Sequence, residues 1–195
     1  QGAKKAGGSL AASRLRALIM VPTRELCMQV FKALDPIARN VNVRVVPIVG
    51  GISHQKQERL ISKHPPEIVV ATPGRYWELV GDEHAHLNDY SALSYLVLDE
   101  ADKMVQQGHF QELTSIFQMV SSSTAGDHRF QTFVFSATLM LPSDMKKRLG
   151  KGGGGGGGAA SLEELMDAVR CRAGKKPTIV DVSPEMRVAE GITEA

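Results

Sequence analysis

The stretch from Ser94 to Met104 reads SYLVLDEADKM and joins two opposite kinds of residue. Residues 95–98 are apolar or aromatic, whereas the carboxylates of Asp99, Glu100 and Asp102 follow almost at once. A short apolar run bounded by polar residues is typical of a buried strand. One explanation of the carboxylates is a charged loop where the strand leaves the core. The other is a site for a metal ion and a water molecule at the end of a buried strand of an α/β protein.

Similar apolar runs recur along the chain, and each is short and rich in Val and Ile, as buried parallel strands are. The expected strands are residues 17–21, 43–49, 68–71, 95–98 and 132–135. Helical patterns lie between them, at residues 23–39, 53–63, 74–81 and 110–120. This alternation predicts right-handed βαβ crossovers and an α/β fold, with a parallel, doubly wound sheet flanked by helices. Ligands of such sheets bind beyond the carboxyl ends of the strands.

Composition limits the class of protein. A chain of 195 residues with 43% hydrophobic content can bury a full core. The chain has 23 Lys and Arg against 21 Asp and Glu, so it has no strong overall positive charge. A surface that binds nucleic acid would therefore have to be a local cluster of basic residues. Cys27 and Cys171 are too few and too far apart for a disulfide framework or a zinc site. The apolar run at residues 15–22 is too short to span a membrane and no signal peptide is visible, so we expect an intracellular protein with no membrane partner.

The chain also divides by composition. Residues 1–13 are small and polar without periodicity, which predicts a disordered lead-in. Residues 14–195 form the expected globular part, interrupted by a flexible glycine loop at 151–160. After that loop, SLEELMDAVR at 161–170 predicts a helix and PTIVDV at 177–182 predicts a strand.

Four further motifs each follow an apolar run: PTREL at 22–26, GG at 50–51, ATPGR at 71–75 and SAT at 136–138. Taken singly, PTREL and ATPGR could be ordinary helix starts and GG an ordinary turn. Together with DEAD at 99–102, and in this order, the motifs resemble the first RecA-like domain of DEAD-box RNA helicases, a fold of the P-loop NTPase class. The resemblance covers residues 17–149.

The resemblance implies ATP and Mg²⁺ as cofactors and assigns roles at the site. Asp99 would position Mg²⁺ on the nucleotide phosphates through water, and Glu100 would orient and deprotonate the hydrolytic water. Asp102 would join the contact that closes this domain on a second RecA-like domain of the same protein. Ser136 and Thr138 would link the phosphate site to RNA.

RNA is the partner that the remaining motifs imply. The residues that would grip its backbone are Thr23, Arg24, Glu25, Gly50, Gly51, Thr72, Pro73, Gly74 and Arg75. Glycines let backbone N–H groups approach phosphates closely, and helix N-termini favour anions. Such contacts read phosphate and 2′-OH groups rather than bases, so little sequence preference is expected.

Flanking residues carry a finer resemblance. SHQKQERL, PPEIVVATPGRYWELV and KMVQQGHFQEL are similar to the nucleolar DEAD-box branch that includes the yeast maintenance-of-killer helicase. That branch implies a role in assembly of the large ribosomal subunit, a nuclear and nucleolar location, and pre-ribosomal proteins as further partners.

The sequence also departs from the family pattern. It contains no G-x-x-x-x-G-K-[ST], and the strand and phosphate-binding loop that would precede PTREL are absent from it, as are the second domain and its arginine fingers. We therefore expect this chain to be part of a longer ATP-dependent RNA helicase and to be inactive by itself. The alternative is a catalytically dead module that binds RNA or protein. The complete Asp99–Glu100 pair favours the helicase, because such a module has no use for metal-binding carboxylates.

Overall fold

The computed structural model describes residues 14–81, 85–124 and 130–137, together with residues 178, 180 and 182. Within these ranges one parallel sheet has the strand order β2-β3-β1-β4-β5. The strands are β1 Ala17–Met20, β2 Val45–Ile48, β3 Ile68–Ala71, β4 Tyr95–Leu98 and β5 Gln131–Val134. The helices are α1 Arg24–Asn40, α2 His54–Lys63, α3 Pro73–Gly81, α4 Ala85–Asn88, α5 Ala101–Gln106 and α6 Phe110–Ser123. The predicted α/β class with a parallel sheet and flanking helices is confirmed.

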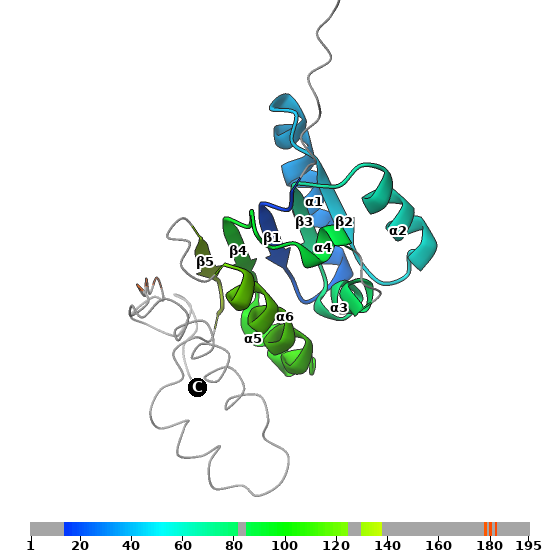
Figure 1. Cartoon of the computed structure of the whole chain (residues 1–195). Helices are drawn as coiled ribbons and strands as arrows, with labels where there is room; N and C mark the ends of the chain where they lie inside the picture. Colours follow the sequence, from blue (N-terminus) through cyan, green and yellow to red (C-terminus); the bar gives the residue numbers. More distant parts are fainter. Residues whose placement is uncertain are drawn as a thin grey trace, which may run out of the picture.

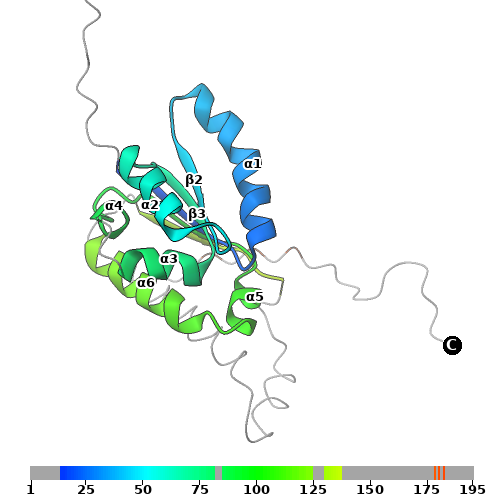
Figure 2. The same ribbon diagram turned by 90° about the vertical axis from the view of Figure 1, so that its right-hand side faces the viewer.

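Helices cover both faces of the sheet (Figure 1). Figure 2 shows α1 on one side, with α3 and α6 on the other. The side chains follow from this arrangement, because successive residues of a strand point to opposite faces. Leu18 and Met20 of β1 belong to the core beneath α3 and α6, whereas Ile19 packs with Cys27 of α1. Ile61 joins α2 to the first of these two cores.

The strands end in register, and this feature places the site. Met20 pairs with Ala71 and with Leu98, Ala71 pairs with Ile48, and Leu98 pairs with Val134. The ladder continues one residue further for four backbone N–H groups. These bonds are Val21 N to Ala71 O (3.0 Å), Thr72 N to Ile48 O (3.1 Å), Asp99 N to Met20 O (2.9 Å) and Phe135 N to Leu98 O (2.8 Å). The segments that follow all five strands therefore leave the sheet side by side at one edge.

Two short helices, α4 and α5, were not predicted. Helix α5 forms inside the DEAD sequence because Ala101, Met104 and Val105 have helical spacing and are all buried. The predicted strand at 177–182 is wrong at its described residues, because Thr178, Val180 and Val182 are exposed and belong to no strand. The predicted lead-in 1–13, glycine loop 151–160 and helix 161–170 lie outside the described residues. Within the described part of the chain, no helix combines the length and apolar character needed to cross a bilayer.

Candidate functional site

The segment after β1 begins α1 with a capped first turn. The hydroxyl oxygen of Thr23 accepts a hydrogen bond from the backbone N–H of Leu26 at 3.2 Å, so Thr23 is the N-cap. The helix-start explanation of this motif is therefore correct for Thr23. Arg24 and Glu25 follow it as exposed residues of the first turn. The free N–H groups and the dipole of a helix N-terminus attract anions, and Arg24 adds a formal positive charge there.

The segment after β2 contacts the segment after β1. Gly51 has φ +77°, a left-handed conformation that glycine adopts without strain. A Cβ atom added to Gly51 would collide with Nη1 of Arg24, whereas one added to Gly50 would meet nothing within 4 Å. The glycine pair and the arginine of the PTREL motif therefore form one small surface.

The segment after β3 is tied to the same surface through Arg75. Helix α3 begins at Pro73, a favourable first helical residue. Only 19% of the Arg75 side chain is exposed, and its Nη1 lies 2.7 Å from Glu78 Oε2. Its Nη2 donates to the carbonyl oxygen of Ile52 at 3.4 Å, directly beyond the glycine pair. Arg75 thus links α3 to the loop that follows β2.

The carboxylates follow β4, and the backbone turns sharply between them. Glu100 has φ +52° and ψ +48°, which is rare for a residue with a side chain and costs about 1–2 kcal/mol. Oδ1 of Asp99 accepts a hydrogen bond from the N–H of Glu100 at 3.0 Å. Asp102 is buried in the first turn of α5. Strain of this kind persists where the surrounding structure fixes it, which is common at functional sites.

The segment after β5 is bonded to the start of α5. The carbonyl oxygen of Phe135 accepts a hydrogen bond from the N–H of Ala101 at 3.0 Å. Ser136 therefore directly follows a residue that is hydrogen-bonded to the DEAD sequence, and Ser136 is half-buried. Thr138 lies outside the described residues.

Two neighbours of the site were not predicted. Nζ of Lys103 lies 2.7 Å from Oε1 of Glu100, and this hydrogen bond raises the pKa of Lys103. The three-residue spacing on a helix would have revealed this pair had α5 been predicted. His109 lies beside Gly74, since a Cβ on that glycine would come 3.7 Å from the imidazole. No sequence signal indicates that second contact, because it depends on how α6 packs against α3.

The donor set suits a magnesium ion that is shared with a substrate. Among the described residues, no cluster of three or more His, Cys, Asp or Glu side chains could hold a metal by itself. Mg²⁺ usually keeps several waters and binds proteins through one or two carboxylates together with phosphate oxygens. Half-buried Asp99, at the open end of β4, offers a carboxylate of this kind.

Carboxylates and helix N-termini at the carboxyl ends of parallel strands occupy the place where α/β domains bind their ligands. Residues 8–146 match the family model described as DEAD/DEAH box helicase, and the chain belongs to that family.

The relatives agree with this assignment. The chain is 42% identical to DEAD-box ATP-dependent RNA helicase 13 of Oryza sativa subsp. japonica, in an alignment that covers 94% of this chain and 24% of that protein. It is 41% identical to ATP-dependent RNA helicase DDX24 of Mus musculus, covering 92% of this chain and 21% of the relative. It is 36% identical to the helicase mak5 of Schizosaccharomyces pombe, covering 94% of this chain and 28% of the relative. The predicted resemblance to the maintenance-of-killer branch is confirmed, and the chain spans about a quarter of the length of these relatives.

Solved structures show the same fold. The DEAD-box helicase Mss116 bound to single-stranded RNA and UDP-BeF matches with a TM-score of 0.57 and 26% identity, over 70% of this chain and 27% of that one. The yeast DEAD-box splicing factor Prp28 matches with a TM-score of 0.56 and 32% identity, over 70% and 30%. The predicted RecA-like fold is confirmed.

Proposed function

We propose that this chain is part of an ATP-dependent RNA helicase that remodels RNA or RNA–protein complexes. The observation that carries the proposal is the common register of the five strands, which brings the DEAD carboxylates and the PTREL, GG and ATPGR segments to one edge. The names of the relatives as ATP-dependent RNA helicases support it, as does the RNA bound to the similar helicase Mss116.

At the DEAD sequence, the proposed chemistry is hydrolysis of ATP. Mg²⁺, when bound with the nucleotide, would neutralise charge that develops on the transferred phosphoryl group. Asp99 would hold that ion through water, consistent with its place at the open end of β4. Glu100 would accept the proton of the attacking water, and the left-handed turn at this residue places it at the start of α5, outside the sheet. The hydrogen bond to Lys103 fixes Oε1 of Glu100 on one side.

Coupling of this site to RNA would pass through the segment after β5. We assign Asp102 to the contact with a second RecA-like domain, and Ser136 and Thr138 to the link with RNA. The bond between Ala101 N and Phe135 O supports this assignment, because a shift of α5 would pull directly on the segment that contains Ser136.

RNA would lie across the three remaining strand ends. Arg24 and Arg75 provide charge, the N-termini of α1 and α3 provide backbone N–H groups, and the Gly50–Gly51 pair allows a close approach. Thr23, Glu25 and the Thr72–Gly74 segment shape the same surface. None of these contacts reads a base edge, so the proposal includes little sequence preference.

A finer assignment rests on the branch of the family. Similarity to DDX24 and to mak5 supports a role in assembly of the large ribosomal subunit in the nucleolus, with pre-ribosomal proteins as partners.

The test is ATP turnover by the longer protein that contains this chain, with and without RNA. RNA should stimulate turnover, and Glu100→Gln should reduce it by on the order of 10²–10⁴, because the amide cannot accept a proton. Glu58→Gln, at an exposed position of α2, is the matched control and should turn over ATP normally. Turnover of the Glu100 variant within a few-fold of the wild-type rate would exclude Glu100 as the base.

A further inference from the structure

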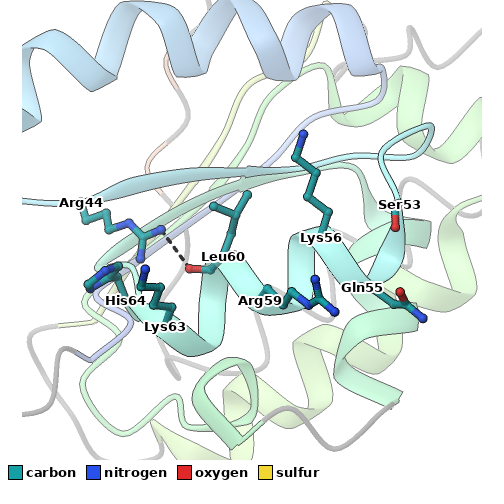
Figure 3. Close-up of a pocket in the computed structure, with 8 residues that line it drawn as sticks. All are labelled: Arg44, Ser53, Gln55, Lys56, Arg59, Leu60, Lys63 and His64. Carbon is teal, nitrogen blue, oxygen red and sulfur yellow. Dashed lines mark hydrogen bonds between the residues drawn. The ribbon is translucent and has the colours of Figure 1, made fainter.

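A basic groove runs along α2 (Figure 3). It has a volume of about 450 Å³, and its cationic lining residues are Arg44, Lys56, Arg59 and Lys63. The exposed side chain of Leu60 adds an apolar portion and His64 adds one imidazole ring, whereas no Asp, Glu, Phe, Tyr or Trp is among the described residues that line the groove. These properties favour a polyanion that offers charge along its length rather than rings for stacking.

One end of the groove adjoins the loop that carries the glycine pair. Ser53 lines one end of it and follows Gly51 by only two positions. Between them, Ile52 is held by Arg75 through its carbonyl oxygen. From Ser53 the ten residues of α2 lead away over about 15 Å, toward Lys63 and Arg44 at the far end (Figure 3). An RNA strand that leaves the glycine pair in this direction would therefore enter the groove.

Arg44 is fixed at the far end of the groove. Its Nη2 donates to the carbonyl oxygen of Leu60 at 2.9 Å, and its backbone N–H donates to Oε2 of Glu67 at 2.8 Å. Its Nη1 is buried and has no hydrogen-bond partner among the described residues. Because this nitrogen is enclosed by the protein, Arg44 contributes positive charge at the far end of the groove rather than a direct contact with a ligand.

We propose that the α2 groove binds the phosphate backbone of RNA, as an extension of the path gripped by the strand-end motifs. The inference rests on the proposed function, because it assigns more of the same RNA to a second surface. Lys56 and Lys63 are both exposed and lie seven residues apart on one side of α2, about 10 Å along its axis. Each would neutralise a different phosphate, and neither would read sequence.

The experiment compares two variants of the 195-residue chain that lose the same charge. Lys56→Gln with Lys63→Gln changes the groove, whereas Arg14→Gln with Lys32→Gln changes exposed positions outside it. Fluorescence anisotropy would follow labelled single-stranded RNAs of about 5 and about 15 nucleotides across a salt series. For the longer RNA, the groove variant should bind several-fold more weakly, with a salt slope smaller by about 1.4, because two phosphate contacts are lost.

The shorter RNA separates the inference from the proposed function. Because this RNA occupies only the strand-end motifs, it should bind the groove variant and the control variant equally. Arg75→Gln should weaken binding of the same RNA. If the groove variant matches the control on the longer RNA while Arg75→Gln still loses affinity, the inference fails and the proposed function stands. If wild-type chain binds neither RNA, both fail. The groove variant could instead bind RNA as well as the control variant does but bind a labelled oligoglutamate more weakly. That result would assign the groove to acidic peptides and overturn the inference. Far-UV circular dichroism would verify that the variants are folded.

Discussion

Gly51 leaves space for the guanidinium of Arg24, and any side chain at this glycine would collide with Nη1. Two motifs that lie far apart in the sequence, GG and PTREL, are therefore packed against each other at the edge of the sheet. The positive φ of Gly51 adds a second constraint, because L-residues rarely adopt this conformation. This surface therefore requires glycine at position 51 but not at position 50.

The first prediction compares the two glycines. Gly51→Ala should displace Arg24 and strain the loop by about 1–2 kcal/mol, so RNA affinity should fall to the level of Arg24→Ala. Gly50→Ala is the matched control, since a Cβ there meets nothing within 4 Å and Gly50 has no positive φ. Anisotropy titrations of labelled RNA would measure both. Equal affinities for the two glycine variants would mean that the position of Arg24 does not matter for RNA.

The sequence predicted the edge but not its internal contacts. Alternating strands and helices were enough to place Asp99, Arg75 and Ser136 beyond strand ends, because parallel strands share one carboxyl edge. The contact of Gly51 with Arg24 and the bond from Arg75 to Ile52 depend on side-chain packing between elements, which a single sequence does not encode locally. The left-handed backbone at Glu100 was also missed, since that residue type rarely adopts it.

The second prediction concerns a pair of buried tyrosines, Tyr76 and Tyr90. The hydroxyl of Tyr76 donates to the carbonyl oxygen of Leu87 at 3.2 Å and is hydrogen-bonded to the hydroxyl of Tyr90 at 3.2 Å. Tyr76→Phe leaves these buried groups without a partner, so the free energy of unfolding should fall by about 1–3 kcal/mol. Tyr95→Phe, at a position that is 47% exposed, should change little. Urea denaturation would measure the difference, and equal midpoints would show that the hydroxyl network does not contribute.

The third prediction is a loss of stability at alkaline pH through Cys27. Its Sγ donates to the carbonyl oxygen of Val70 at 3.1 Å, and burial raises the pKa of the thiol from 9.0 to about 12. Between these pH values the unfolded chain releases the thiol proton and the folded chain keeps it, so stability falls as pH rises. Below pH 9 the thiol is protonated in both states and has no such effect.

The test for Cys27 is urea denaturation between pH 9 and 10, below the range in which the buried tyrosines dominate. The wild-type free energy of unfolding should decrease over this interval, and Cys27→Ala should show a smaller decrease, although the smaller side chain lowers its stability at every pH. Parallel pH dependences for the two proteins would show that the Cys27 thiol is not responsible.

The fourth prediction is that the 195-residue chain binds single-stranded RNA weakly and without a response to ATP. Its sequence contains no G-x-x-x-x-G-K-[ST], so the lysine and backbone cradle for nucleotide phosphates are missing from it. A nucleotide can tighten RNA binding only if it binds one state of the protein better than another, and here it would have little affinity for either. RNA affinity should fall with salt, because the contacts are made by a few cations to phosphates. Anisotropy of a labelled RNA with and without Mg-ATP would measure the effect, with the longer protein as the control that should respond. A clear tightening by Mg-ATP in the 195-residue chain would show that other residues hold the nucleotide phosphates.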